Sequence, residues 1–100
     1  MSIIILKDDD KFPNSLEGIS EIHFEEGTFN VGEIKPSKSL TLIGKSKKTI
    51  IKGSFDTSVL GSLDYLTVLN ATILSKKKEY FLKATGPSEV YMNNIKTGYY

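Results

Sequence analysis

Residues 39–53, Ser-Leu-Thr-Leu-Ile-Gly-Lys-Ser-Lys-Lys-Thr-Ile-Ile-Lys-Gly, contain two short β-rich runs. The runs cover residues 40–43 and 49–51, and Gly44 stands at the bend between them. A single coil of this kind leaves two strand edges without hydrogen-bond partners and cannot bury its apolar side chains alone. The stretch therefore predicts one coil of a parallel β-solenoid, with further coils stacked on it.

Apolar pairs two residues apart recur along the chain. This period-two spacing is that of a strand with one buried face. The first members of successive pairs lie 18, 26 and 24 residues apart, which is too long for a hairpin and too short for a βαβ unit. We expect the pairs to lie directly above one another; they are Ile22 and Phe24, Leu40 and Leu42, Leu66 and Val68, and Val90 and Met92.

A bend residue follows most pairs at the same offset. Four positions after the first apolar residue stand Glu26, Gly44, Asn70 and Asn94, with Gly27 beside the first. Glycine and asparagine tolerate the left-handed backbone conformation that a sharp bend between two strands requires. The offset therefore predicts a bend at the same place in each coil.

Two further apolar clusters follow each bend and predict three inward faces per coil. Polar loops are expected at 45–48, 53–58, 75–79 and 84–88. The residues after the bend are Phe29, Ile50, Ile51, Ile73, Leu74 and Ile95, and the third cluster contains Ile34, Val59, Leu60, Phe81 and Leu82.

The pattern predicts one all-β domain over residues 1–100, a short right-handed parallel β-helix of about four coils. Residues 1–20 are expected to form an N-terminal strand and cap, and residues 21–100 the coils. An antiparallel sandwich or barrel with turns at the glycines and at Asn70 is the alternative. The parallel arrangement is favoured because the repeat register places glycine and asparagine where a bend needs them.

Charge is distributed unevenly along the chain. Residues 1–34 hold eight acidic residues against two lysines, whereas residues 35–100 hold eleven lysines against four acidic residues. In a solenoid, position in the sequence follows position along the axis, so one end should be acidic and the other basic. The chain contains neither cysteine nor arginine, which excludes zinc–thiolate sites and removes the usual bidentate group for phosphates and carboxylates.

No targeting or membrane segment is expected. The apolar run at residues 3–6 is too short for a signal peptide and is followed at once by three aspartates. No run approaches the roughly eighteen apolar residues that cross a bilayer. We therefore expect no membrane partner and a cytoplasmic or virion-associated protein.

Three segments resemble the opening coils of the pectin lyase-like superfamily of right-handed parallel β-helix proteins, most closely the pectin methylesterases. They are residues 23–31, His-Phe-Glu-Glu-Gly-Thr-Phe-Asn-Val, residues 39–44, Ser-Leu-Thr-Leu-Ile-Gly, and residues 49–53, Thr-Ile-Ile-Lys-Gly. The resemblance implies the β-helix fold and a carbohydrate as ligand or substrate. Enzymes of the superfamily carry aspartates, arginine or calcium-binding acids on later coils, and the sparse acids here are Asp56, Asp64, Glu79 and Glu89.

Individual candidates for catalysis are weak. His23 is the only histidine and is expected on the surface, and residues 8–10 lack the spaced oxygens of a calcium loop. Asp64 and Glu89 could approach each other on adjacent coils, as glycoside chemistry would need. We expect solvated charges instead, and therefore no enzyme, no metal and no cofactor.

Two basic runs and several tyrosines remain as binding candidates. The lysine runs could contact a polyanion, although they equally suit soluble strand edges. Exposed tyrosines could form a sugar platform or an interface. The polyanion candidates are Lys45, Lys47, Lys48, Lys76, Lys77 and Lys78; the sugar candidates are Tyr65, Tyr80 and Tyr91; the interface candidates are Tyr99 and Tyr100.

The leading functional hypothesis is a non-catalytic structural or interaction module that presents a rigid solenoid surface. It is expected to associate with itself or with a larger assembly, because an uncovered coil exposes apolar side chains and strand edges. Carbohydrate binding or cleavage is one alternative and polyanion binding another. Nucleic acid is not an expected partner, since the net charge is only +1 and arginine is absent.

Overall fold

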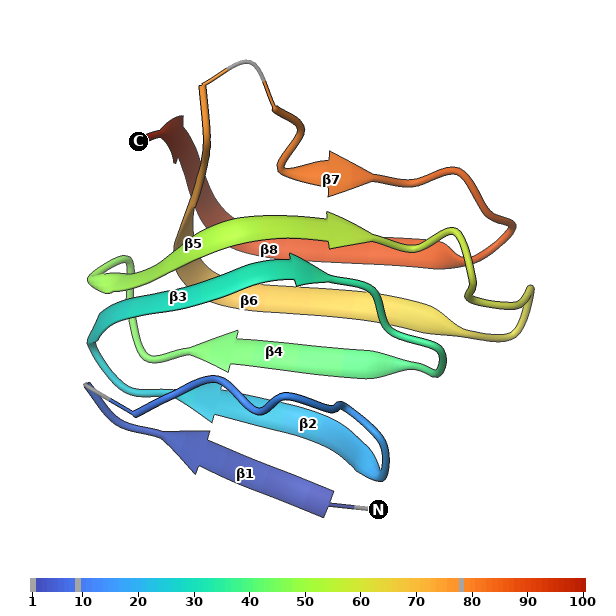
Figure 1. The fold of residues 1–100 in the computed structure, drawn as a ribbon, viewed down its shortest axis with the longest axis horizontal. Helices are drawn as coiled ribbons and strands as arrows, with labels where there is room; N and C mark the ends of the chain where they lie inside the picture. Colours follow the sequence, from blue (N-terminus) through green and yellow to red (C-terminus); the bar gives the residue numbers. More distant parts are fainter. Residues whose placement is uncertain (1, 9, 78) are drawn as a thin grey trace.

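The computed structural model describes residues 2–8, 10–77 and 79–100, and these residues form eight β-strands (Figure 1). Their lengths range from 2 to 11 residues. The strands are β1 (Ser2–Leu6), β2 (Ile19–Phe24), β3 (Gly27–Ile34), β4 (Leu40–Gly44), β5 (Thr49–Asp56), β6 (Tyr65–Ser75), β7 (Leu82–Lys83) and β8 (Glu89–Tyr99).

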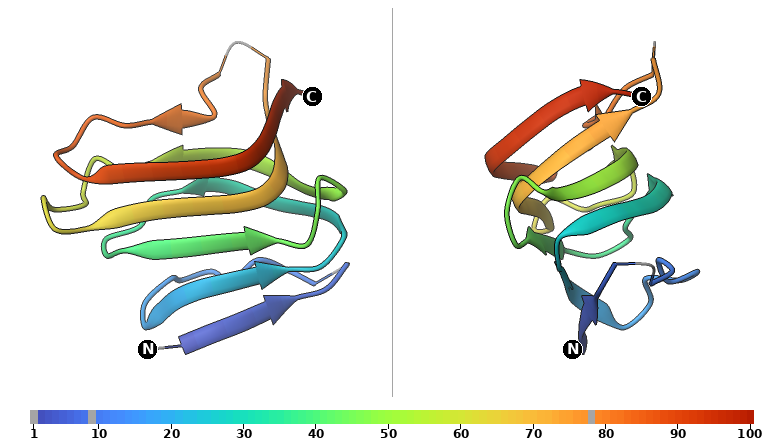
Figure 2. Two further views of the ribbon diagram at one scale, coloured as in Figure 1. Left: turned by 180° about the vertical axis from the view of Figure 1, so that it is seen from behind. Right: turned by 90° about the vertical axis from the view of Figure 1, so that its left-hand side faces the viewer.

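Every strand pairing in the described part of the chain is parallel. The order β1-β2-β4-β6, with β8 beyond β6, follows the chain from the N-terminus to the C-terminus. Seen from behind, these strands lie one above the next and point the same way (Figure 2). The protein is therefore a parallel β-solenoid of about four coils, as the repeat predicts, and the antiparallel sandwich is wrong.

Each coil turns through up to three faces. The first face consists of β1, β2, β4 and the first halves of β6 and β8. The second face consists of the first halves of β3 and β5 and the second halves of β6 and β8. The third face consists of the ends of β3 and β5 and the short strand β7.

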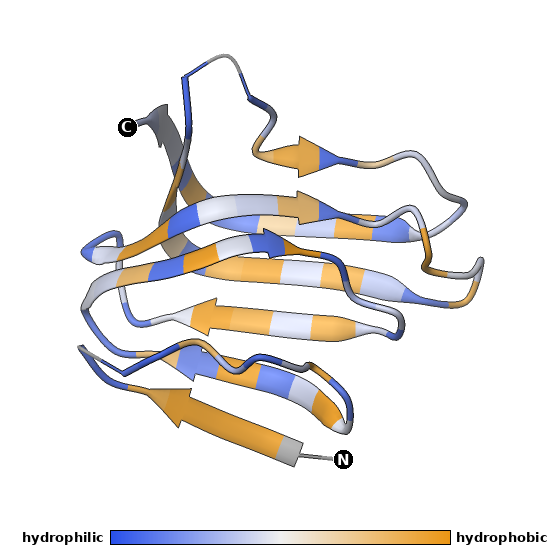
Figure 3. Cartoon of the chain, viewed as in Figure 1, coloured by the Kyte–Doolittle hydropathy of each residue, from blue (hydrophilic) through white to orange (hydrophobic). Residues whose placement is uncertain are grey.

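The inward side chains form columns along the axis. On the first face one column runs through Ile4, Ile22, Leu42, Val68 and Met92, which are register partners from coil to coil. The three middle members are fully buried, and burying each such side chain stabilises the fold by about 1.5–3 kcal/mol. Figure 3 shows the resulting alternation of apolar and polar residues along β4 and β6.

The register of the second coil differs from the prediction. Ile22 pairs with Leu42 rather than with Leu40, so the first step is two residues longer than predicted. A shift of two residues leaves the same side chains facing inward, and the hydrophobic pattern therefore cannot distinguish the two registers. The structure places Phe24, and not Glu26, beside Gly44.

The predicted left-handed bends are confirmed at Asn70 and Asn94, whose φ angles are 55° and 56°. The Asn94 side-chain amide also donates to Asn70 Oδ1 at 3.0 Å, which links the two bends. Gly44 has a different reason for being glycine. A Cβ atom there would lie 2.1 Å from the carbonyl oxygen of Asn70, so only a glycine lets the two coils approach this closely.

The loop predicted at residues 53–58 is partly wrong, because the third face includes residues 53–56 as strand. β5 continues to Asp56, and Phe55 is 1% exposed between Ile34 below it and Leu82 above it. Val59, expected in this cluster, is 51% exposed, whereas Leu60 is buried in the turn that follows. A lone phenylalanine among glycine, serine and aspartate shows no periodicity in the sequence, and only the neighbouring coils give it a buried site.

Residues 7–8 and 10–18, the described part of residues 7–18, which we call the N-terminal arm, run beneath the second and third faces where the first coil would otherwise have strands (Figure 1). The ring of Phe12 packs edge-on against Phe24, with 6.3 Å between the ring centroids. Phe24 in turn stacks on Phe29, with 5.0 Å between the centroids. Leu16 packs against the same core. The arm thereby shields the N-terminal end of the core from water.

We predict that Gly44→Ala destabilises the protein by about 2 kcal/mol or more, because the new methyl group would overlap the Asn70 carbonyl. Gly61→Ala is the matched control, since its Cβ would lie 3.3 Å from its nearest neighbour, an oxygen of the Asp64 side chain. Urea unfolding of both variants measures the difference. Equal stability of the two variants would contradict the close approach of the coils at Gly44.

Candidate functional site

The last coil leaves its core side chains partly open to solvent. Val90, Met92 and Ile95 of β8 are half-buried. Their register partners one coil below, Leu66, Val68 and Ala71, are all 0% exposed. The difference arises because the β6 residues have a coil on each side, whereas the described residues place a coil on only one side of β8.

The backbone edge of β8 is open as well. The N–H of Glu89 donates to the carbonyl oxygen of Asp64, so the backbone groups of Glu89 point toward β6. Backbone groups alternate in direction along a strand, and those of Val90 and Met92 therefore point away from β6. Within residues 2–8, 10–77 and 79–100, no strand pairs with that side of β8. We call these apolar side chains and this backbone edge the open coil.

Neighbouring segments widen the open coil. Leu82 of β7 and Phe81, which precedes it, are half-buried and pack against the same core. β7 pairs with β5 through Leu82 and Lys83 only. Tyr99 and Tyr100, the predicted interface residues, lie beside this region at 68% and 48% exposure. The Tyr100 N–H donates to the Ser75 carbonyl at 2.9 Å, so the last residue continues the pairing with β6.

The lysines of residues 45–48 form the turn between β4 and β5. The Lys45 ammonium lies 3.6 Å from a carboxylate oxygen of Glu25, and the neighbouring Ser46 hydroxyl donates to Glu26 at 2.7 Å. The carbonyl oxygens of Lys47 and Lys48 accept hydrogen bonds from Thr72 and Gly27. The turn therefore closes the coil through its backbone, while the lysine side chains remain exposed.

The second lysine run follows β6. Lys76 and Lys77 are exposed, and the third member, Lys78, lies outside the described residues. The turn at 45–48 precedes the second face and residues 76–77 follow it, so the two runs lie at opposite ends of that face. The described residues of the two lysine runs therefore do not form a joint patch. Polyanion contact stays a prediction for each run.

Two of the three tyrosines predicted to bind sugar lie close together, and the third lies in a separate loop. Tyr65 and Tyr91 lie on the outer side of the first face, one coil apart, with Glu89 directly above Tyr65. They are 41% and 51% exposed, and the Tyr91 hydroxyl donates to the Glu89 carboxylate. Tyr80, at 76% exposure, lies in the loop before β7. Two of the three tyrosines are therefore neighbours, and the third is not.

The acidic candidates have structural partners. Asp64 accepts hydrogen bonds from the Gly61 N–H at 2.8 Å and from the Ser39 hydroxyl at 3.3 Å, and so holds a turn together. His23 contacts Glu21 at 2.6 Å on the outer side of the first face. Asp10 accepts from the Lys7 N–H at 2.7 Å. In the described part of the chain, no three histidine or acidic residues are grouped to hold a metal ion.

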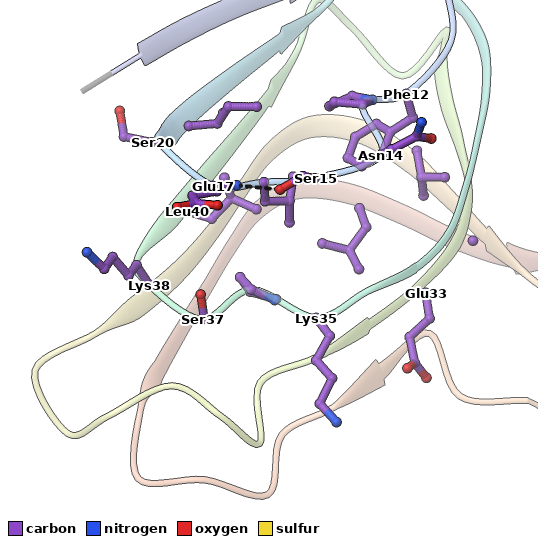
Figure 4. Close-up of a pocket in the computed structure, with 18 of the residues that line it drawn as sticks. Phe12, Asn14, Ser15, Glu17, Ser20, Glu33, Lys35, Ser37, Lys38 and Leu40 are labelled. Atoms are coloured by element: carbon purple, nitrogen blue, oxygen red, sulfur yellow. Dashed lines mark hydrogen bonds between the residues drawn. The ribbon is translucent and has the colours of Figure 1, made fainter.

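A cleft of about 1250 Å³ lies between the N-terminal arm and residues 30–39 (Figure 4). It exists because the arm replaces the strands that a complete first coil would place below β3. Its lining mixes acidic side chains with Lys35 and Lys38, and the Ser15 hydroxyl accepts from the Glu17 N–H at 3.2 Å inside the arm. Charges of both signs favour no single class of ligand.

Asp56 ends β5 and anchors the turn above it. The backbone N–H of Ser58 donates to Asp56 Oδ1 at 2.9 Å. This bond, the Ser58 hydroxyl and, more weakly, the charges of Lys35 and Lys83 lower the pKa of Asp56, although burial acts in the opposite direction. The carboxylate is therefore a structural acceptor on the third face.

A scan against protein-family models, a search of curated proteins and a search of solved structures each find no match. The described residues also include no helix that is long and apolar enough to cross a membrane. The class of the protein, a parallel β-solenoid with an open last coil, is therefore defined by its strand register and its exposed edge.

The lowered pKa of Asp56 predicts a pH dependence of stability. Its contribution is fully present above the ordinary aspartate pKa of about 3.9 and is lost as the pH falls through the lower value of the folded state. Asp56→Asn should therefore lower the thermal midpoint at pH 7, and the gap from the wild type should narrow toward pH 2. Glu33→Gln removes an exposed carboxylate from the same face, and this control should leave the thermal midpoint at pH 7 nearly unchanged.

Proposed function

We propose that the protein is a structural module that associates through its open coil. The observation that carries this proposal is the exposure of Val90, Met92 and Ile95, whose partners one coil below are completely buried. Apolar side chains of this kind, next to unpaired strand edges, are typical of surfaces that another chain covers. β-Strand addition would satisfy the backbone and the side chains together.

The remaining features suit a surface that binds rather than reacts. Asp10, Asp56 and Asp64 accept hydrogen bonds from backbone N–H groups of turns. The only histidine is paired with Glu21 on the outer side of the first face. The stacked columns make the solenoid a rigid support, because each interior residue is held by the coils above and below it. A rigid edge loses little conformational entropy when it binds, which favours association.

We also infer that the chain is related to the pectin lyase-like superfamily. The support is that the three resembling segments occupy consecutive structural positions. Residues 23–31 span the end of β2 and the start of β3, residues 39–44 contain β4, and residues 49–53 open β5. The shared pattern thus coincides with two successive coils rather than with scattered strands.

The association can be tested with a charge placed at the open coil. Val90→Glu should weaken self-association, measured by sedimentation velocity over a concentration series, at least about tenfold, because the carboxylate would have to be buried against the partner. Thr28→Glu adds the same charge to an exposed position on the second face and should leave the association constant nearly unchanged. A wild-type chain that stays monomeric at every concentration contradicts the proposal.

A second candidate function is carbohydrate binding at Tyr65 and Tyr91. The observation that favours it is their placement on adjacent coils of the same outer face, with Glu89 between them as a hydrogen-bond acceptor. Partly exposed aromatic rings next to a polar acceptor can hold a sugar ring by stacking and hydrogen bonding.

Glycan-array binding distinguishes this candidate from the first. If the tyrosine pair binds sugar, Tyr65→Ala and Tyr91→Ala should each reduce the signal several-fold, since each removes one stacking surface worth about 1 kcal/mol. Tyr80→Ala, in a separate loop, should leave it unchanged. An array without any signal for the wild type removes the candidate.

A further inference from the structure

We propose that the partner of the open coil is the N-terminal end of a second copy of this chain, so that copies stack head to tail. In this arrangement β8 of one copy pairs in parallel with β1 of the next. The inference rests on the proposed self-association and adds its polarity, its register and its open-ended symmetry.

The backbone groups of the two edges are complementary. The Leu6 carbonyl accepts from the Glu25 N–H at 2.8 Å, so the backbone groups of Leu6 point toward β2. By alternation, those of Ile3 and Ile5 point to the other side of β1, where the described residues place no strand. On β8 the groups of Val90 and Met92 are the ones that point outward. In a parallel ladder Met92 would bond to Ile3 and Ile5 of the next copy.

The side chains continue their columns in the same register. With Met92 opposite Ile4 of the next copy, the inward column of the first face runs on without interruption. On the outer side, Tyr91 would lie beside Ile3, which is 56% exposed. The exposed Ile5, at 62%, would lie beside Asn93. On the first face, the junction thus repeats the contacts that join the coils within one chain.

The charges of the two ends also favour this polarity. Residues 7–18, the N-terminal arm, carry four acidic residues against two lysines, and residues 76–100 carry five lysines against two glutamates. The side chains of Asp8, Asp10 and Glu17 on the arm are exposed, as are those of Lys83 and Lys96 near the open coil. Head-to-tail stacking brings opposite charges together, and raising the salt concentration should weaken it.

A two-fold dimer that joins β8 to β8 is the competing arrangement. It would cover the same apolar side chains but would bring the two basic ends face to face, and it would leave the β1 edge open. A head-to-tail interface does not close on itself, because each added copy presents a new open coil. Wild-type assemblies should therefore lengthen with concentration rather than stop at a dimer.

Proline variants test the polarity. Ile5→Pro removes the outward N–H of β1 at a position whose side chain is already exposed, and Met92→Pro removes an outward N–H of β8. Neither change removes a hydrogen bond between strands of the same copy. Ile5→Thr and Met92→Leu keep the N–H groups and are the matched controls. Circular dichroism is the check that each variant remains folded.

We expect each proline variant alone to be monomeric in sedimentation velocity, because each lacks one of the two edges. An equimolar mixture should form a one-to-one dimer and nothing longer, joined by the intact β8 of Ile5→Pro and the intact β1 of Met92→Pro. Self-association of Ile5→Pro alone would overturn the polarity and leave the proposed self-association standing. A monomeric wild type would overturn both.

Cysteine crosslinking gives the same answer without relying on the proline variants. The chain contains no cysteine, and neighbouring strands bring opposite Cα atoms within disulfide range. Under oxidation, a mixture of Ile3→Cys and Tyr91→Cys should form the mixed disulfide, faster than a mixture of Ile5→Cys and Tyr91→Cys, which are not opposite. A disulfide of Tyr91→Cys with itself in preference to the mixed product would overturn the head-to-tail register.

Discussion

Parallel hydrogen bonding between successive coils is the interaction on which the rest of this structure depends. A strand of one coil has no partner within its own coil, so its N–H and C=O groups are satisfied only by the coils before and after it. The inward columns follow from this pairing, because register partners place like side chains above one another. Stability therefore accumulates coil by coil, and the terminal coils are the places where it is incomplete.

The two ends of the solenoid meet this constraint differently. At the N-terminal end the arm lays Phe12 and Leu16 over the core and leaves β1 as a five-residue edge. At the other end β8 presents 11 residues with apolar side chains only half covered. The edges of β1 and β8 are complementary in three respects. Their outward backbone groups can pair, their apolar side chains continue one column, and the charges of the two ends are opposite. The proposed junction between two chains follows the same rule that joins coils within the chain.

The bends show how single residues make such stacking possible. Asn70 and Asn94 adopt the left-handed conformation and bond to each other, whereas Gly44 provides space for the Asn70 carbonyl. Asp56 and Asp64 hold turns through backbone N–H groups. These turn contacts explain how loops of different length leave the coils in register.

The sequence by itself determined the parallel solenoid, the left-handed bends at Asn70 and Asn94 and the uneven charge, because these depend on local periodicity, on residues that tolerate positive φ and on composition. It also located the columns from Leu40 onward. Only the tertiary structure decided the pairing of Ile22 with Leu42, the burial of Phe55 and the neighbourhood of Tyr65 and Tyr91. The physical reason is that a shift by two residues preserves every inward side chain, so the choice of register is made by packing between coils. The partial exposure of Val90, Met92 and Ile95 was also decided by the tertiary structure, because burial is complete only where a coil lies on each side.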